Sequence, residues 1–350
     1  MFNKINFAVT FFIILVLFSG CSSEHHQNRQ SHFEKWIESN GKVKVLSTTA
    51  MIDDLVHQIG GEHVDTFILI QGELDPHSYQ LVKGDDEKLS FAQLIFYNGL
   101  GLEHGPSLHH YLTGNSKAVS LGNQIDRHHP SEVIDISGQK DPHIWMDVSL
   151  WSKAVPFIVE ALSRQDPSHA DVYAANGQGL QEELNKVHLE VREIMQQVPS
   201  SKRFLVTSHD AFHYFARAYL SEGDELQSGE WKKRFAAPEG LAPESQLSTG
   251  DIKSIIEHLH RHQIPLIFPE SNVSRDSIRK IVQAGREKGL DVSIACCSLY
   301  GDAMGPKGSE GDTYMKMLLY NAHTLSGHME PQIAAAENAR KTSSKVKIDE

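Results

Sequence analysis

The chain has 350 residues and carries 33 basic against 45 acidic side chains, which gives a formal net charge of −12. An acidic balance of this size argues against nucleic acid and anionic lipid surfaces as partners and is compatible with binding cations. With 40% hydrophobic and 22% charged residues, the chain is long enough for two ordinary domains. We expect a globular monomer.

The first twenty residues have the features of a secretion signal. Lys4 precedes an apolar run from Phe7 to Phe18 that is short for a membrane span, and small residues separate this run from Cys21. The ending Leu17-Phe18-Ser19-Gly20-Cys21 resembles a bacterial lipobox, which implies cleavage before Cys21 and acylation of that cysteine. We therefore expect residues 1–20 to be a signal peptide and Cys21 to anchor the chain on the extracytoplasmic side of a bacterial membrane. The alternative is an ordinary signal anchor with an incidental cysteine.

Residues 21–40 are polar and are predicted to form a flexible tether. In the next segment, 41–165, short β-rich runs alternate with helical periodicity. The expected strands are 42–48, 64–70, 93–97 and 117–121, and the expected helices are 50–59 and 104–112. Such alternation predicts a parallel sheet with helices on both faces, in which ligands gather at the carboxyl ends of the strands.

Residues 166–198 form a long stretch with apolar residues at helical spacing and no proline between Pro167 and Pro199. The stretch predicts one long helix, locally weakened by Gly177 and Gly179, that joins two sheet-forming lobes as a stiff strut. We expect a second α/β lobe at 199–329, with an irregular segment at 221–249, and a disordered tail at 330–350. The expected strands of this lobe are 203–207, 265–268 and 292–295, and its expected helices are 211–220, 251–262, 274–288 and 310–325.

The predicted fold class is therefore α/β, with two lobes that each contain a mostly parallel sheet flanked by helices and are joined by one long rigid helix. Four side chains follow apolar runs of this pattern: His77, His143, His209 and Asp302. The first two are preceded by the same Asp-Pro pair, and proline stiffens the loop that presents each histidine. Three neutral imidazoles and one carboxylate make a good site for a divalent metal ion. We predict that these four residues hold one ion.

Two other groups attract attention. His258, His260 and His262 lie on one predicted helix, but they lack the glutamate of the zinc-peptidase arrangement, so a solvated helix face is the favoured interpretation. Cys296 and Cys297 are adjacent, and a disulfide between neighbours is strained. We expect buried thiols in a strand, with a redox or metal-related role as the alternative.

The chain carries several motifs in order: the lipobox, Asp75-Pro76-His77-Ser78-Tyr79, the run from Ile95 to Glu103, Asp141-Pro142-His143-Ile144-Trp145-Met146-Asp147, Ser208-His209-Asp210-Ala211-Phe212, Pro269-Glu270-Ser271-Asn272 and Gly311-Asp312-Thr313-Tyr314. Together they resemble the metal-binding lipoproteins of zinc, manganese and iron ABC importers, the cluster A-I group with its TroA, ZnuA and PsaA types. The resemblance covers about Val43 to Ser326. The segment from Trp231 to Glu244 is most similar to the chlamydial YtgA type.

The resemblance implies two lobes joined by a rigid helix, one metal in the cleft between them, and delivery to a membrane permease powered by an ATPase. The family's ligand positions fall on His77, His143, His209 and Asp302, and Asp75, Asp141 and Glu270 are expected to support them. Manganese-selective relatives carry glutamate at the third position, whereas this chain has His209. Unlike dedicated zinc-binding members, it has no long histidine-rich loop.

Ligand chemistry favours Zn²⁺, because three imidazoles and one carboxylate suit four-coordinate zinc. A bidentate Asp302 would also admit manganese or iron. A metal-dependent adhesin is one alternative function. A metallohydrolase is a weaker alternative, since a catalytic site keeps an open coordination position and four protein ligands leave little room for one.

Overall fold

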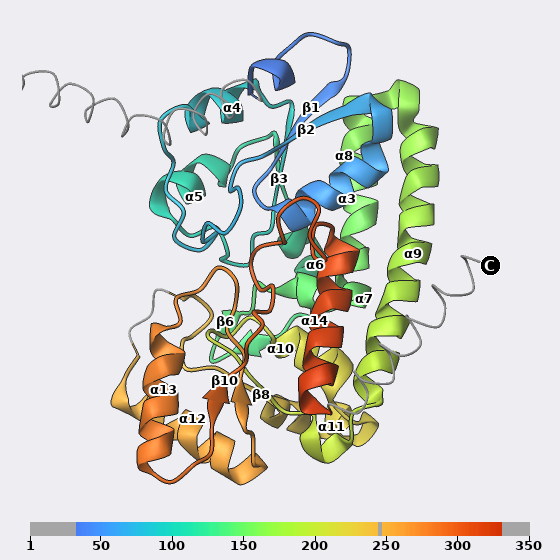
Figure 1. Cartoon of the computed structure of the whole chain (residues 1–350). Coiled ribbons are helices and arrows are strands. Elements are labelled where there is room, and N and C mark those ends of the chain that lie inside the picture. Colours follow the sequence, from blue (N-terminus) through green and yellow to red (C-terminus); the bar gives the residue numbers. More distant parts are fainter. Residues whose placement is uncertain (1–32, 244–246, 331–350) are drawn as a thin grey trace, which may run out of the picture.

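The first half of the molecule is built around a four-stranded parallel sheet. The computed structural model describes residues 33–243 and 247–330, and Figure 1 shows their arrangement. The strands are β1 (Val43–Ser47), β2 (Val64–Ile68), β3 (Leu94–Tyr97) and β4 (Ala118–Ser120), in the order β2-β1-β3-β4. In this register Val45 of β1 lies opposite Thr66 and Leu94. The signal peptide, Cys21 and most of the expected tether lie outside the described residues, as does the expected tail beyond Glu330.

Hydrophobic side chains cover both faces of this sheet. Val45 and Leu46 are adjacent and fully buried, and they belong to two separate core clusters because neighbouring strand residues point to opposite faces. The helices of this half are α3 (Ala50–Gly60), α4 (Asp85–Phe91), α5 (Pro106–Leu112), α6 (Leu121–His128), α7 (Val148–Trp151) and α8 (Val155–Gln165). A small antiparallel hairpin joins β5 (Asp135–Ile136) to β6 (Gln139–Lys140). The sequence patterns had indicated α3 and α5 but not α4, α6, α7 or α8.

The second half contains two pairs of short parallel strands. The pairs are β7 (Leu205–Val206) with β8 (Phe235–Ala236), and β9 (Leu266–Ile267) with β10 (Ser293–Ile294). The N–H of Phe268 donates to the carbonyl of Val206 at 2.9 Å, so β9 lies next to β7 and the pairs form one layer. Helices α12 (Thr249–His262) and α13 (Asp276–Glu287) cover one face of it.

The long helix α9 (Ala170–Gln196) joins the halves. Its 27 residues span about 40 Å, and it contacts α3 and α8 of the first half and α14 (Tyr314–Met329) of the second. Gly177 does not interrupt it: a Cβ there would lie 2.6 Å from Val159, so the glycine allows α8 to pack closely. The predicted α/β class with a single joining helix is confirmed. No described helix has the length and apolar character that crossing a membrane requires.

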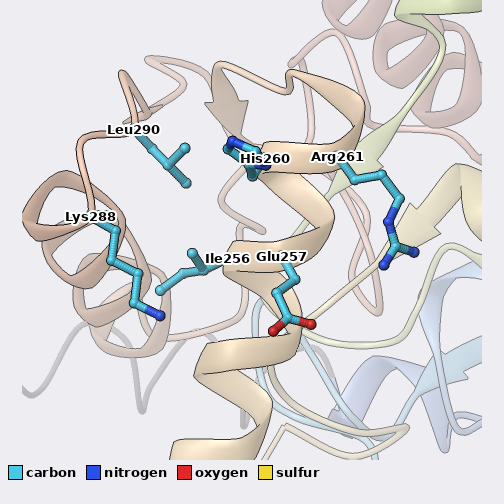
Figure 2. Close-up of a pocket in the computed structure, with 6 residues that line it drawn as sticks. All are labelled: Ile256, Glu257, His260, Arg261, Lys288 and Leu290. Carbon is cyan, nitrogen blue, oxygen red and sulfur yellow. The ribbon is translucent and has the colours of Figure 1, made fainter.

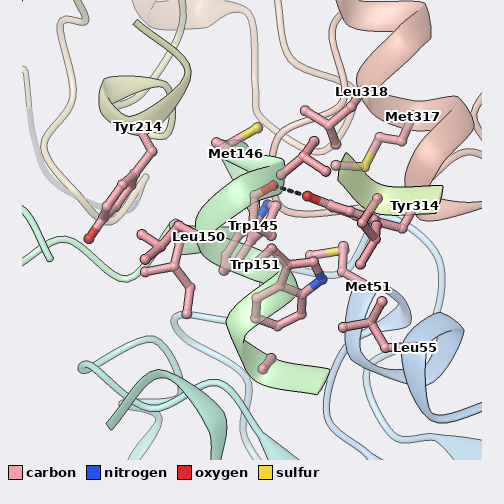
Figure 3. Close-up of a cluster of buried hydrophobic side chains, with 14 of the residues drawn as sticks. Met51, Leu55, Trp145, Met146, Leu150, Trp151, Tyr214, Tyr314, Met317 and Leu318 are labelled. Atoms are coloured by element: carbon pink, nitrogen blue, oxygen red, sulfur yellow. Dashed lines mark hydrogen bonds between the residues drawn. The ribbon is translucent and has the colours of Figure 1, made fainter. Parts of the chain in front are cut away.

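A shared core connects the halves close to the segments that carry His143 and Asp302. Figure 3 shows Met51 and Leu55 of α3, Trp151 of α7, and Tyr314 of α14 packed together. The hydroxyl of Tyr314 donates to the carbonyl of Trp145 at 2.6 Å. The indole N–H of Trp145 in turn donates to the carbonyl of Gly301, beside Asp302, at 3.0 Å.

Two local predictions were wrong, and a third was right only in part. The segment 221–249 is not simply irregular: it contains α11 (Gly223–Ser228), the 3₁₀ turn Glu230–Arg234 and β8, held by the ion pair between Arg234 and Glu225 at 2.8 Å. The helix expected at 211–220 is present from His213 to Leu220, but only α10 (His213–Phe215) is α-helical and the rest, Ala216–Leu220, is a π-helical turn. The two adjacent cysteines are not buried in a strand, because β10 ends at Ile294 and Cys296 is exposed.

Candidate metal centre

His77 is presented by a loop that begins after β2. The carboxylate of Asp75 accepts hydrogen bonds from the backbone N–H of His77 at 2.9 Å and from the hydroxyl of Ser78 at 2.5 Å. The carbonyl of His77 accepts from the N–H of Gly105 at 3.1 Å. These bonds hold the histidine from both sides, and its side chain is only 2% exposed. Asp75 therefore orients the backbone of His77 and does not contact its ring.

His143 is held by a carboxylate that it shares with a second histidine. One oxygen of Asp141 accepts from the backbone N–H of His143 at 2.9 Å and lies 2.7 Å from its Nδ1, so the ring directs Nε2 away from Asp141. The other oxygen lies 3.1 Å from Nδ1 of His213. Burial alone would raise the pKa of Asp141, but the charges and hydrogen bonds of His143 and His213 hold it well below its usual range.

Two supporting residues were not predicted from the sequence. His213 is nine-tenths buried, and its only signal in the sequence is its position four residues after His209. Glu103 accepts hydrogen bonds from the hydroxyl of Thr48 and from the N–H groups of Asn98 and Gly99. The side chain of Asn98 then donates to the carbonyl of Pro142 at 2.9 Å, which fixes the loop that carries His143.

His209 follows β7 and is oriented by Glu270. One oxygen of Glu270 accepts from the backbone N–H groups of Ser208 and His209, both at 3.0 Å, and the other lies 2.7 Å from Nδ1 of the His209 ring. Burial lowers the pKa of His209, but the negative charges of Glu270 and Asp302 outweigh this effect and raise it well above its usual value. Glu270 thus forms an ion pair with the ring of His209, but this contact lacks the hydrogen-bond geometry that joins Asp141 to His143.

The four predicted side chains converge on one point. Nε2 of His209 lies 3.1 Å from Asp302, Nε2 of His77 and Nε2 of His143 each lie 3.4 Å from Asp302, and the two latter nitrogens are 3.3 Å apart. All four residues are buried, and one ligand atom from each lies within 4.8 Å of the others. Two come from each half of the chain.

The geometry of these atoms fits a bound ion better than a hydrogen-bonded cluster. Both oxygens of Asp302 and Nε2 of His209 are buried, and none makes a hydrogen bond of acceptable geometry. Buried polar atoms without hydrogen bonds are costly unless another partner satisfies them. Ligand atoms at about 2.0 to 2.2 Å from a four-coordinate ion are about 3.3 to 3.6 Å apart, close to the separations measured here. The donor set therefore fits a divalent transition metal.

A hollow of about 710 Å³ borders this cluster, and both halves of the chain line it. Of the four residues of the cluster, His77 lines it, with Leu100 and His104 from the first half and Gly240 and Leu241 from the second. The remaining lining residues include Asp126 and Lys140, so both signs of charge are present.

Three further hollows in the described second half are lined by other residues. Figure 2 shows one between α12 and α13, lined by Ile256, Glu257, His260, Arg261, Lys288 and Leu290. Its His260 belongs to the histidine group 258–262, and in the described part of the chain these histidines do not form a cluster with metal-ligand spacing. Burial lowers the pKa of His258 to about 4, so this histidine is neutral at physiological pH.

Comparison with known proteins identifies the family to which this chain belongs. Residues 45–327 match the ZnuA family, described as zinc-uptake complex component A, periplasmic, and the chain belongs to it. The metal-binding protein YtgA of Chlamydia trachomatis is 37% identical over 284 residues, which are 81% of this chain and 85% of that protein. The zinc-binding protein TroA of Treponema pallidum is 32% identical, with 82% and 89% covered. The manganese-binding lipoprotein MntA of Bacillus subtilis is 33% identical, with 81% and 89% covered.

Solved structures agree with this assignment. The crystal structure of Fe(III)-bound YtgA from Chlamydia trachomatis superposes with a TM-score of 0.78 at 36% identity, covering 83% of this chain and 98% of that one. Periplasmic zinc-binding TroA from Treponema pallidum superposes with a TM-score of 0.74 at 31% identity, covering 83% and 99%. The fold is that of a TroA-like metal receptor with a long connecting helix.

Proposed function

We propose that this chain is the extracytoplasmic receptor of an ABC-type metal importer. In this proposal His77, His143, His209 and Asp302 bind one divalent transition metal ion between the two halves, and the loaded receptor delivers it to a membrane permease and its ATPase. The observation that carries the proposal is the convergence of four buried donor atoms, two of them held by the carboxylates Asp141 and Glu270. Membership of a family of periplasmic zinc-uptake components supports the same function.

Zinc is the ion that this ligand set favours. Three imidazole nitrogens and one carboxylate suit tetrahedral Zn²⁺, and the general affinity order of divalent metals places zinc above manganese and iron. The relatives are named for different metals: TroA for zinc, MntA for manganese, and YtgA has been solved with Fe(III). The tightest ion in vitro is therefore not necessarily the ion that is transported.

Cys21 completes the proposal as the point of membrane attachment. Its lipobox resembles the acylation site of bacterial lipoproteins, and lipoproteins are named among the relatives. A receptor tethered on the extracytoplasmic side stays close to the permease that it supplies. A hydrolytic function is disfavoured, because four protein donors already fill a tetrahedral ion and leave no position for an activated water.

The first test of the proposal is competition among metals. The chelator-stripped protein is equilibrated with equal concentrations of Zn²⁺, Mn²⁺ and Fe²⁺ under reducing, anaerobic conditions and analysed for bound elements, with Cys296 and Cys297 replaced by serine so that only the buried site is counted. About one zinc per chain is expected. His209→Glu, combined with Glu270→Gln to avoid two facing carboxylates, should shift the content towards manganese, because carboxylates suit that ion better than imidazole does. No bound metal would contradict the proposal.

Delivery is tested separately. The permease and ATPase reconstituted in vesicles should hydrolyse ATP faster with the metal-loaded receptor than with the metal-free receptor, and metal should accumulate inside. A receptor that binds one ion tightly but leaves both rates unchanged would retain the metal site and overturn the importer function.

A further inference from the structure

A second group of metal-ligand side chains lies on the surface of the second half. Cys296 and Cys297 follow β10, and His328 lies in the last turn of α14. The sulfur of Cys296 is 3.3 Å from that of Cys297 and 3.4 Å from Nε2 of His328. One donor atom from each of the three residues lies within 4.8 Å of the others. Unlike the buried cluster, this one contains sulfur and is open to solvent, since Cys296 is exposed.

The ring of His328 is oriented as the ring of a metal ligand usually is. Its Nδ1 lies 2.7 Å from the carbonyl of Thr324, so Nδ1 carries the hydrogen and donates it to that oxygen. The lone pair of Nε2 then points towards the cysteines. The ring packs edge to face against Phe268, with ring centres 5.5 Å apart and planes at 83°. Two contacts thus hold the imidazole in a position where it can accept a metal ion.

The cysteines are also available to a metal ion. With the hydrogen of His328 on Nδ1, its Nε2 can accept a hydrogen bond from the thiol of Cys296, 3.4 Å away, and a metal ion can take the place of that proton. Metal binding releases the protons of both thiols, because the thiolate is the form of cysteine that binds a metal ion. The two sulfurs are in contact as free thiols, so both remain available as ligands.

We propose that Cys296, Cys297 and His328 form a second metal site that takes a thiophilic ion, Zn²⁺ or Cu(I). Two thiolates and one imidazole match the soft donors that these ions prefer over the harder manganese and iron. A tetrahedral Zn²⁺ would keep one open position for water or an external ligand, whereas Cu(I) accepts three ligands. The site shares no residue with the buried cluster and would be loaded independently of it.

Cobalt is the probe that separates the two sites. Co²⁺ bound to thiolate shows a sulfur-to-metal charge-transfer band in the near ultraviolet, and the buried cluster has no sulfur to produce it. The full chain is purified in detergent with Cys21→Ser, so that Cys296 and Cys297 are the two remaining thiols. Under reducing, anaerobic conditions the band should saturate when about one Co²⁺ per chain is bound in addition to the ion held by the buried cluster. It should disappear on added Zn²⁺, and a competition titration with a Cu(I) chelator tests the other ion.

Variants assign the ligands. Cys296→Ser and Cys297→Ser should abolish the band or weaken Co²⁺ binding more than tenfold, and His328→Asn should weaken it about tenfold or more. His260→Asn, which removes a surface histidine of α12, is the matched control and should leave the band unchanged. Binding of one metal at the buried cluster, measured on the same preparations, shows that each variant is folded and keeps failure of this site distinct from failure of the receptor function.

Three results would overturn the proposal. The first is the absence of the band in a preparation in which a thiol reagent detects two free thiols per chain, since both cysteines are then reduced and available. The second is a band of equal strength in His328→Asn and His260→Asn, which would exclude the imidazole. The third is saturation at half an ion per chain together with dimerisation, which would place the ion between two molecules.

Discussion

The buried cluster of His77, His143, His209 and Asp302 and the surface cluster of Cys296, Cys297 and His328 differ in how firmly the fold holds their ligands. In the buried cluster a carboxylate lies 2.7 Å from Nδ1 of His143 and another 2.7 Å from Nδ1 of His209, and all four side chains are buried. In the surface cluster one ring is fixed by a neutral carbonyl, and one cysteine is exposed. The residues of the buried cluster and their carboxylate partners therefore come from both halves, whereas the surface cluster needs only one loop and the end of one helix.

Asp302→Ala should have the largest effect, because it removes the only charged ligand of the buried cluster and leaves three histidines facing one another. Affinity for Zn²⁺ at this site, measured by competition with a chelator, should fall by well over 100-fold, beyond the range of about 10- to 100-fold that losing a supporting hydrogen bond causes. The thiolate band of the surface cluster should persist. Asp86→Ala, on an exposed position of α4, is the control. Near-normal affinity in Asp302→Ala would remove Asp302 from the site.

Glu270→Gln should weaken binding at the buried cluster by about 10- to 100-fold. Both oxygens of Glu270 face N–H groups, one the backbone of Ser208 and His209 and the other Nδ1 of the His209 ring. Glutamine has only one oxygen, so its NH₂ group must face one of these N–H donors, and no hydrogen bond can form there. Isothermal titration of each variant with Zn²⁺ measures the effect, and Glu257→Gln, at an exposed position of α12, is the control. Equal affinities in the two variants would show that Glu270 does not orient the ligand.

The pH dependence of binding tests the charge state of His209. Its pKa is raised well above the usual value by Glu270 and Asp302, against the effect of burial, so the metal-free chain keeps this proton at neutral pH and an incoming ion must displace it. Affinity should therefore rise with pH up to that folded pKa and fall by up to about tenfold per pH unit below it. Glu270→Gln should flatten the slope near neutral pH. A wild-type affinity independent of pH would contradict the assignment.

Tyr314→Phe should have the smallest effect on metal binding of these changes, because it alters the stability of the fold and none of the four predicted ligands. The variant keeps the ring in the shared core but leaves the buried carbonyl of Trp145 without its donor, which costs about 1 to 3 kcal/mol of unfolding free energy. Urea denaturation measures the free energy of unfolding, and Tyr111→Phe, at a half-buried tyrosine of α5, is the control. The surface cluster should be unaffected. Unchanged stability would mean that this hydrogen bond does not hold the halves together.

Much of the framework can be predicted from the sequence, because its apolar runs are long and several residues that orient the site lie within a few positions of the histidines they support. The Asp-Pro-His frames place Asp75 and Asp141 two residues before a histidine, and the observed hydrogen bonds to the backbone of His77 and His143 are equally local. His209 follows a recognisable strand, and the long periodic stretch that became α9 is unambiguous. These features make four separated residues readable as one candidate cluster.

What the sequence does not predict depends on distant contacts. His213 reaches Asp141 across 72 residues, and Asn98 reaches Pro142 across 44, so neither partner is visible in local periodicity. The strand β8 has two residues, too few for any pattern, and it exists because it pairs with β7. Cys296 and His328 are 32 residues apart, and only the packing of α14 brings them together.

Anomalous diffraction can show directly whether His77, His143, His209 and Asp302 bind one ion. Crystals of the zinc-loaded protein, with Cys296 and Cys297 replaced by serine, are measured on both sides of the zinc absorption edge. We predict a single strong peak per chain, about 2.0 to 2.2 Å from Nε2 of each histidine and from a carboxylate oxygen of Asp302. A peak elsewhere, or none within reach of these four side chains, would contradict the account.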